Sequence, residues 1–314
     1  MAAGGLVLIF PGQGAQQPGM GAALVAAGVE AELLEVAAQG GLALGRLLVE
    51  GSEAELRPTQ VAQPALYYVG TALGRLLLDR GVVPDFGAGH SLGEYTALAV
   101  AGALDPADGM RLVMARGRLM ADAPDGTMAA VLGLEREPLD AICRDVASRG
   151  DVCVVANDNS PGQLVISGTR SGIEAASTAA RRAGARRVVP LNVGGAFHSP
   201  LMRAAASAFA AVLADVEIRD PRWPVASGCS GALARTAAEV RDALARQLSS
   251  PVLWTQVVNA LVQAGATRFI ECGPGNTLGA LVRRIAPGSL VATAATPDAI
   301  DIALDAVAGD GVVG

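Results

Sequence analysis

The sequence contains no lysine, so all 24 of its basic residues are arginine. This absence fits a coding sequence rich in G and C and by itself indicates no function. Acidic residues number 30, and the formal net charge of −6 argues against a nucleic-acid-binding protein, which needs a clustered basic surface. Histidine is also scarce, because the chain has only His90 and His198. A reaction that uses an imidazole base therefore has two candidates for that base.

Cysteine and long apolar segments are scarce as well. The four cysteines have neither C-x-x-C nor zinc-ligand spacing, so the sequence predicts no metal site and no disulfide framework, and we expect buried, reduced thiols. The start of the chain lacks a basic segment and continues into residues 6–10, an apolar run too short to span a bilayer. We therefore expect a soluble, cytoplasmic protein with no membrane contact.

Aromatic residues make up only 3% of the chain, which leaves its core to alanine, valine and leucine. Hydrophobic residues make up 51% and charged residues 17%, a composition typical of compact globular proteins. With 314 residues the chain is long enough for one large domain, or for a domain that carries a smaller insertion.

The order of apolar segments predicts an α/β fold. Residues 6–10 form an apolar run that ends at Pro-Gly-Gln-Gly, which is typical of a buried strand followed by a tight turn. Residues 64–80 have helical spacing, and a further helix is expected to begin at Asp105-Pro106, with proline in its first turn. Residues 268–271 form a late run that is followed by Gly-Pro-Gly at residues 273–275, and we expect another strand there.

The middle of the chain has a different pattern. Between residues 126 and 193 the apolar segments alternate as β-α-β-β-α-β, the order of a ferredoxin-like unit. We therefore predict two subdomains. The large α/β subdomain comprises residues 1–125 and 194–314 and contains a parallel sheet, and residues 126–193 form an inserted, ferredoxin-like small subdomain.

The stretch GHSLG at residues 89–93 fits the pattern G-x-S-x-G. In a nucleophile elbow a strand turns sharply into a helix, glycines relieve the crowding, and the serine stands at the helix N-terminus, where an oxyanion is favoured. The flanking residues suit this geometry, with an apolar run before the motif and a helical pattern after it. The motif alone is only moderately specific, because a chain rich in alanine and glycine can match it by chance.

His198 is the better candidate for the base that Ser91 needs. Neighbouring residues at a turn point in different directions, so His90 is poorly placed to approach the serine oxygen to within about 2.6–3.2 Å. His198 follows a predicted strand, precedes a helix and has glycines beside it. That position lies at the rim of the sheet, where ligand sites of α/β folds occur. No acidic residue occupies an obvious strand end after the serine.

Seven motifs in a fixed order make the chain resemble a known family, the malonyl-CoA:acyl carrier protein transacylases and the related acyltransferase domains of polyketide synthases. The match runs nearly end to end, through FPGQGAQ at residues 10–16, AQPAL at 62–66, GHSLGEYTAL at 89–98, MARGRLM at 114–120, NDNSPGQLVISG at 157–168, GAFHSPLM at 195–202 and ECGPGNTL at 271–278. The resemblance implies a hydrolase-like large subdomain with a ferredoxin-like insert, which agrees with the segmentation above.

The resemblance also implies catalytic roles. Ser91 is similar to the nucleophile that carries the acyl group as an ester, and His198 to a base held by a backbone carbonyl in the Gln247-Leu248 region instead of by an aspartate. The backbone N–H groups of Gln13 and Leu92 would form the oxyanion hole. Loss of one such donor typically costs about 10²–10³ in rate.

Arg116 matches the arginine that binds the free carboxylate of malonyl in this family. Its chemistry supports the role independently, because a guanidinium grips a carboxylate with two parallel charge-assisted bonds that lysine cannot copy. Arg111 and Arg118 are expected to be solvated. The resemblance further implies that Gln63, Asn159, Gln247 and Phe197 line or support the substrate site.

The implied reaction is ping-pong transfer of malonyl from malonyl-CoA to the phosphopantetheine thiol of an acidic acyl carrier protein, with no metal or bound cofactor. Phe197 and Leu92 resemble the malonyl type, because a phenyl ring near the α-carbon leaves little room for a methyl branch. Two arginine clusters, at residues 181–187 and 283–284, are candidates for carrier docking. The family is commonly monomeric, so we expect a monomer.

Several alternatives stay open at this point. A free-standing polyketide acyltransferase would use another acyl-CoA or acyl-carrier donor, and an editing hydrolase would cleave acyl thioesters. A malonate decarboxylase subunit should have an elbow closer to GLSIG, and a lipase should have the order serine, acid, histidine. A non-catalytic carrier-binding module would not need Ser91, His198 and Arg116 together. The sequence distinguishes neither fatty acid from polyketide synthesis nor one carrier protein from another.

Overall fold

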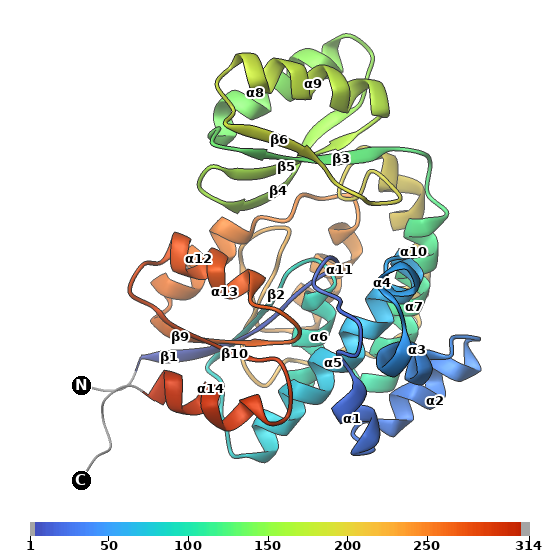
Figure 1. Cartoon of the computed structure of the whole chain (residues 1–314), viewed down its shortest axis with the longest axis vertical. Helices are drawn as coiled ribbons and strands as arrows, with labels where there is room; N and C mark the ends of the chain where they lie inside the picture. Colours follow the sequence, from blue (N-terminus) through green and yellow to red (C-terminus); the bar gives the residue numbers. More distant parts are fainter. Residues whose placement is uncertain (1–3, 309–314) are drawn as a thin grey trace.

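Two β-sheets, stacked one above the other in Figure 1, organise the protein. The computed structural model describes residues 4–308. The larger sheet has the strand order β10-β9-β1-β2-β7-β8. Its strands are β1 (Gly5–Phe10), β2 (Phe86–Gly89), β7 (Val225–Ala226), β8 (Leu233–Ala234), β9 (Ala266–Cys272) and β10 (Leu290–Ala294). All neighbouring pairs are parallel except β7 and β8. The predicted parallel sheet is confirmed, with one short antiparallel strand at its edge.

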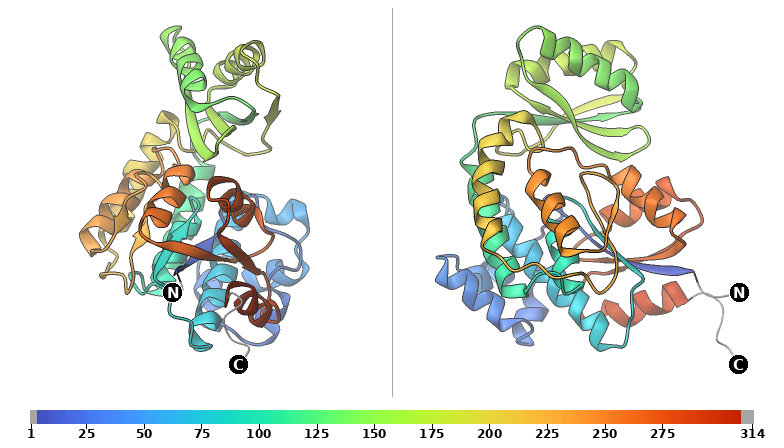
Figure 2. Two further views of the ribbon diagram at one scale, coloured as in Figure 1. Left: turned by 90° about the vertical axis from the view of Figure 1, so that its left-hand side faces the viewer. Right: turned by 180° about the vertical axis from the view of Figure 1, so that it is seen from behind.

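The smaller sheet is antiparallel and has the strand order β4-β5-β3-β6. Its strands are β3 (Thr127–Leu132), β4 (Cys153–Ser160), β5 (Gln163–Gly168) and β6 (Arg187–Pro190), and α8 (Arg136–Ser148) and α9 (Arg170–Arg182) connect them. Both helices cover the outer face of this sheet (Figure 2). The chain order β-α-β-β-α-β and this strand order together confirm the predicted ferredoxin-like unit. The division into a large subdomain (residues 1–125 and 194–314) and a small one (residues 126–193) stays a prediction, and the presence of two separate sheets supports it.

Helices surround the larger sheet (Figures 1 and 2). They are α1 (Ala22–Ala26), α2 (Ala31–Gln39), α3 (Leu44–Glu50), α4 (Glu53–Leu56), α5 (Thr59–Asp79), α6 (Gly93–Val100), α7 (Pro106–Ala121), α10 (Arg203–Ala214), α11 (Ala237–Gln247), α12 (Trp254–Gln263), α13 (Thr277–Ile285) and α14 (Ala299–Ala308), with a short 3-10 turn at Pro200–Met202. The helical pattern was expected from residue 64, but the helix begins at Thr59, so Pro64 lies inside the helix. Proline usually marks the first turn of a helix, which explains the difference. No helix within residues 4–308 is long and apolar enough to cross a membrane.

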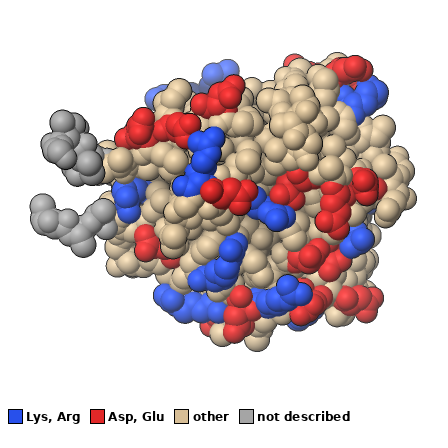
Figure 3. All heavy atoms as spheres, turned by 90° about the horizontal axis from the view of Figure 1, so that it is seen from below, with Lys and Arg blue, Asp and Glu red and all other residues tan. Residues whose placement is uncertain are grey.

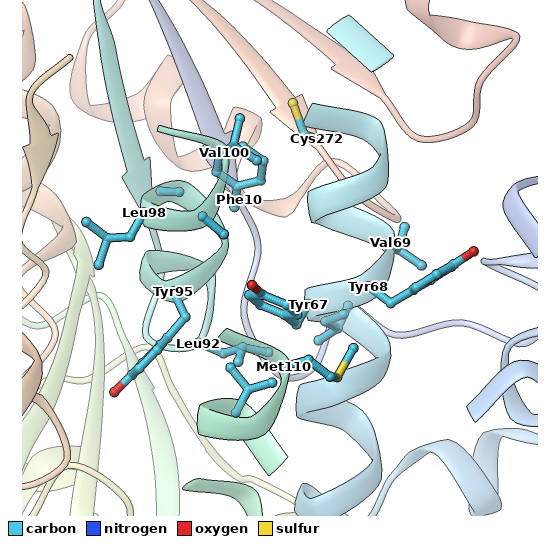
Figure 4. Packing of buried hydrophobic residues seen from close by; sticks show 14 of the residues in the cluster. Phe10, Tyr67, Tyr68, Val69, Leu92, Tyr95, Leu98, Val100, Met110 and Cys272 are labelled. Atoms are coloured by element: carbon cyan, nitrogen blue, oxygen red, sulfur yellow. The ribbon is translucent and has the colours of Figure 1, made fainter. Parts of the chain in front are cut away.

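The main core lies between the larger sheet and helices α5, α6 and α7. Figure 4 shows Tyr67 on α5 beside Leu92 and Met110, whereas Tyr68 and Val69 project from the other side of that helix, and all five side chains are buried. Helix α6 packs against β1 and β2, and α7 packs against α5 and α6. The two strands are paired so that Phe10 lies opposite Gly89. The PGQG turn after β1 and the serine turn after β2 therefore meet at the same edge of the sheet.

Candidate active site

The GHSLG stretch forms a sharp turn between β2 and α6. Ser91 has φ 53°, in the left-handed region that costs a residue with a side chain about 1–3 kcal/mol. A Cβ on Gly89 would lie 1.9 Å from the carbonyl carbon of Gly93, and a Cβ on Gly93 would lie 2.0 Å from the carbonyl oxygen of Phe10. Glycine is therefore required on both sides of the serine, as a nucleophile elbow requires.

His198 contacts Ser91 directly. It lies in the loop between β6 and α10, with φ 58°, and its Nε2 is 2.8 Å from the Oγ of Ser91. The other ring nitrogen, Nδ1, lies 3.1 Å from the carbonyl oxygen of Gln247 and 3.0 Å from that of Ser250. A carbonyl only accepts hydrogen bonds, so Nδ1 carries the proton in the neutral ring. Nε2 is then free to accept the proton of the serine hydroxyl.

The surroundings of His198 keep its imidazole neutral. Burial, the positive charge of Arg116 and the proximity of His90 oppose the hydrogen bonds to the two carbonyls, and together these effects lower the pKa of His198 to about 3. The ring is therefore uncharged across the physiological pH range, which a proton acceptor requires.

His90 points away from the serine hydroxyl. Its Nε2 is 2.9 Å from the Oδ1 of Asn159, and its ring packs against Trp254 with 5.8 Å between centroids. Burial also lowers the pKa of His90. Of the two histidines, the structure places His198 and not His90 against the oxygen of Ser91.

Arg116 is a buried cation beside the same oxygen. It projects from α7, is 1% exposed, and its Nη2 donates to the Oγ of Ser91 at 2.9 Å. Nη1 donates to the Oε1 of Gln63 at 2.8 Å, and Nη2 also donates to the Oε1 of Gln247 at 3.0 Å. All three acceptors are uncharged, so the guanidinium keeps a full positive charge for an anionic ligand. Arg111 is exposed and paired with Asp108, and Arg118, also exposed, donates to a backbone carbonyl.

A cavity of about 180 Å³ lies over these groups, between the larger body and the small sheet. The residues that line it are Gln13, His90, Ser91, Leu92, Arg116, Met120, Met128, Asn157, Asn159, Val165, Leu191, Val193, Phe197 and His198. Phe197 and Asn159 are thus both in the wall of the cavity. Gln63 and Gln247 are buried behind the guanidinium instead, where they hold Arg116 and do not line the cavity.

The backbone N–H groups of Gln13 and Leu92 are both at this cavity. Neither donates a backbone hydrogen bond within residues 4–308. Leu92 lies at the N-terminus of α6, where the helix dipole favours negative charge. Two unpaired donors beside a serine can stabilise an oxyanion.

A second hollow, of about 200 Å³, adjoins the first. It shares Gln13, His90 and Asn159 with the cavity and extends between the PGQG turn and α13. Gln163 lines this hollow and accepts a hydrogen bond from the Nη1 of Arg284 at 3.0 Å. Among the described residues, no group of three or more His, Cys, Asp or Glu side chains could hold a metal ion.

The sequence interpretation missed Glu94 and the apolar wall of the cavity. Glu94 is 2% exposed, and its Oε2 accepts from the Nε2 of Gln247 at 2.6 Å. An acidic residue in the first turn of an otherwise apolar helix was the available signal. Met120, Met128 and Val165 come from three separate elements, and nothing local in the sequence distinguishes them from ordinary core residues.

Comparison with known proteins gives consistent matches. Residues 7–294 match the model of the acyl transferase domain. The chain is 40% identical over 304 residues to the malonyl CoA-acyl carrier protein transacylase of Bacillus subtilis, covering 95% of this chain and 96% of that protein. It is 42% identical over 283 residues to the polyketide biosynthesis protein ThaF of Burkholderia thailandensis, which covers 89% of this chain but 24% of that longer protein.

A solved structure has the same fold along nearly the whole chain. It is described as a type II PKS acyl-carrier protein in complex with its malonyl-transacylase. The TM-score is 0.90 at 38% identity, with 96% of this chain and 99% of that chain covered.

Proposed function

The chain belongs to the family of acyl transferase domains, and from that premise we propose that it moves a malonyl group from malonyl-CoA to the phosphopantetheine thiol of an acyl carrier protein. It is an acyl-carrier-protein S-malonyltransferase that serves fatty acid or polyketide synthesis. The observation that carries the proposal is the 2.9 Å contact between the guanidinium of Arg116 and the Oγ of Ser91. This contact supports the proposal, because a cation beside the serine oxygen can pair with the free carboxylate of a short acyl group carried on that oxygen.

The first half-reaction loads the serine. The Oγ of Ser91 attacks the thioester carbonyl of malonyl-CoA while the Nε2 of His198 takes the hydroxyl proton. The carbonyl oxygen becomes an oxyanion, which the N–H groups of Gln13 and Leu92 stabilise. The carbon–sulfur bond then breaks, His198 returns the proton to the departing sulfur, and CoA leaves. The product is a malonyl ester on Ser91.

The second half-reaction reverses these steps with a different thiol. The phosphopantetheine thiol of the carrier gives its proton to His198 and attacks the ester carbonyl. The same two N–H groups hold the oxyanion, and the carbon–oxygen bond to Ser91 breaks. His198 then returns the proton to the serine oxygen. Side chains and backbone groups of this chain account for every proton in this scheme, so the proposal includes no resident cofactor.

Arg116 supports the choice of acyl group. A malonyl carboxylate can accept two parallel hydrogen bonds from a guanidinium, and the buried position of Arg116 makes that interaction stronger than it would be in water. A neutral acyl group would leave the cation unpaired. This disfavours an editing hydrolase for neutral acyl chains. Phe197 in the cavity wall favours malonyl over methyl-branched acyl groups, although one methylene is worth only about 1–3 kcal/mol.

We place the carrier protein at Arg283 and Arg284. Both are exposed, and Arg284 is joined through Gln163 to the hollow that leads to the cavity. The cluster at residues 181–187 lies at the end of α9 and in β6 on the small subdomain. Figure 3 shows arginine and acidic side chains interspersed over the lower face of the large body, which gives an acidic partner no single-sign surface there. We also expect the protein to be monomeric and cytoplasmic.

Mass spectrometry of the intact protein tests the proposal. Exposure to malonyl-CoA should add one malonyl group, and peptide mapping should locate it on Ser91. Addition of holo carrier protein should move the group to the carrier and restore the unmodified enzyme mass. Ser91→Ala should gain no malonyl group. An adduct that forms equally well on Ser91→Ala, or that reaches water as fast as it reaches the carrier, would contradict the proposal.

A further inference from the structure

Glu94 is a buried carboxyl group that the mechanism above does not use. It lies three positions after Ser91, in the first turn of α6. Its Oε2 accepts from the Nε2 of Gln247 at 2.6 Å and from the backbone N–H of Gly228 at 3.2 Å. The side chain is 2% exposed, and no ion pair within residues 4–308 includes it. Burying an ionised carboxyl group without a cation in contact with it costs free energy of folding, so the hydrogen bonds of Glu94 must offset that cost.

The amide of Gln247 connects Glu94 to Arg116. A carboxylate only accepts hydrogen bonds, so the NH₂ group of Gln247 must face Glu94. The carbonyl end of the same amide then faces the guanidinium, and Oε1 of Gln247 lies 3.0 Å from Nη2 of Arg116. The Nε2 of Gln247 also donates to the carbonyl oxygen of Ser91 at 3.0 Å. Glu94 therefore decides which end of the amide meets the cation.

Arg116 has no carboxylate partner of its own. Its hydrogen-bond acceptors are Gln63, Ser91 and Gln247, all uncharged, and its guanidinium lies 5.4 Å from the ring centroid of Tyr95. Burial lowers the pKa of Arg116, and the negative charge of Glu94, one amide away through Gln247, is among the effects that oppose this lowering. Glu94, the counter-charge, therefore does not contact the guanidinium of Arg116 directly. The guanidinium stays available to a ligand carboxylate in the cavity.

We propose that Glu94 is a positioning residue and the counter-charge for Arg116, and that it takes up a proton when the malonyl carboxylate binds the guanidinium. The inference rests on the proposed function, because it concerns the same acyl site. When Glu94 is ionised, the empty site contains one positive charge, on Arg116, and one negative charge, on Glu94. Binding of the malonyl carboxylate adds a second negative charge next to the same cation, and protonation of Glu94 restores the balance.

The environment of Glu94 allows this protonation near neutral pH. Burial raises the pKa of Glu94 to about 7, against the opposing effects of Gln247, Gly228 and Arg116. The other titratable groups near Glu94 stay neutral in that range, because burial raises the pKa values of Tyr95 and Cys229, and the pKa of His198 is about 3. Both hydrogen bonds of the carboxyl group reach Oε2, so Oε1 can carry the proton without turning the amide of Gln247.

The sign of the pH effect follows from these charges. Below about pH 7 Glu94 is neutral, and Arg116 attracts the malonyl carboxylate without competition. Above about pH 7 Glu94 is ionised. When malonyl binds, Glu94 must then either take up a proton or remain charged and repel the malonyl carboxylate. Loading with malonyl-CoA should therefore weaken as pH rises through this window. Loading with acetyl-CoA, which has no carboxylate, should lack this component.

The test compares the ratio of kcat/KM for malonyl-CoA to kcat/KM for acetyl-CoA in single-turnover loading of Ser91, over the range from about pH 6 to about pH 8.5. In the wild-type protein the ratio should fall by about tenfold as pH rises. This is the expected effect of repulsion between the ionised Glu94 and the malonyl carboxylate in a partly screened interior. In Glu94→Gln, which can keep the amide geometry but cannot ionise, the ratio should not change with pH. The exposed Glu32→Gln is the matched control and should behave like the wild type.

A pH-independent ratio in the wild type, or the same slope in Glu94→Gln, would overturn the inference. Absence of any malonyl ester on Ser91 would instead overturn the proposed function, so the two failures are distinguishable. If Glu94→Gln does not fold, the wild-type protein alone decides the question. At pH 7 a pH indicator should then report more proton uptake on loading from malonyl-CoA than from acetyl-CoA, and equal uptake would refute the role of Glu94.

Discussion

The Oγ of Ser91 contacts both Arg116 and His198. The Nη2 of Arg116 donates to this oxygen at 2.9 Å, and the Nε2 of His198 lies 2.8 Å from it. A base alone would suit any acyl group. We expect the buried guanidinium to favour an acyl group that carries a negative charge, because an unpaired cation in a buried site is costly.

Arg116→Ala should lose malonyl loading selectively. Removing a charge-assisted hydrogen-bond donor costs about 1.5–3 kcal/mol, so kcat/KM for malonyl-CoA should fall about 10- to 150-fold. Acetyl-CoA loading should stay the same or improve. Arg116→Lys should recover only part of the loss, because an ammonium group cannot make two parallel bonds to a carboxylate. Loading is measured by intact-protein mass, with the exposed Arg111→Ala as the control; an equal loss for both acyl groups would contradict this role.

The loading rate should not fall as pH drops through about 6.5, the usual pKa of histidine. The pKa of His198 is about 3 in the folded protein, so the base stays neutral well below pH 6. A half-maximal loss of acetyl loading at about pH 6.5 would show that this is wrong. Acetyl-CoA is the suitable substrate for the measurement, because we expect its loading to be independent of the charge on Glu94.

The same pKa shift predicts a pH dependence of stability. Between about pH 3 and about pH 6.5 the unfolded chain binds a proton at His198 that the folded protein does not bind, so the free energy of unfolding should fall as pH falls through that range. The contribution has an upper limit of about 1.4 kcal/mol per pH unit. Urea unfolding at several pH values should show a steeper decline for the wild type than for His198→Ala.

Phe197→Ala should relax the choice of acyl group. The ring lines the cavity and is 6% exposed, so its removal makes room for a methyl branch. One methylene is worth about 1–3 kcal/mol, so the preference for malonyl over methylmalonyl should fall by about 10-fold or more. Competition between the two CoA esters, read from the masses of the Ser91 adducts, measures this ratio. An unchanged ratio would remove Phe197 from the selectivity of the site.

Gly93→Ala should disrupt the serine turn. The added methyl group would lie 2.0 Å from the backbone carbonyl oxygen of Phe10, which cannot move without breaking the pairing of β1 and β2. We expect loss of loading together with a Tm lowered by several degrees or more. Gly194→Ala is the control, because a Cβ there meets no atom within 4 Å. A stable, active Gly93→Ala protein would contradict the geometry of the elbow.

Much of the fold was predictable because its signals are local. The alternation of apolar segments predicted the β-α-β-β-α-β unit, and the strand order confirms it. Asp105-Pro106 predicted the start of α7, where Asp105 accepts hydrogen bonds from the backbone N–H groups of Ala107 and Asp108. The start of α5 was misplaced, since the helical pattern was taken to begin at Pro64 although the helix begins at Thr59.

The sequence by itself determined which chemical groups are present. The sequence contains only two histidines, one serine in a glycine-flanked turn and an arginine in the helix predicted from Asp105-Pro106. These groups restricted the possible reactions before any contact was known. Tertiary structure alone decided how these groups meet, because contacts between distant residues depend on the path of the whole backbone. His198 reaches Ser91 across 107 positions, and Gln247 reaches Glu94 across 153. No local pattern contains such pairings, and for that reason the sequence proposed His198 as the base but did not indicate the link from Glu94 to Arg116.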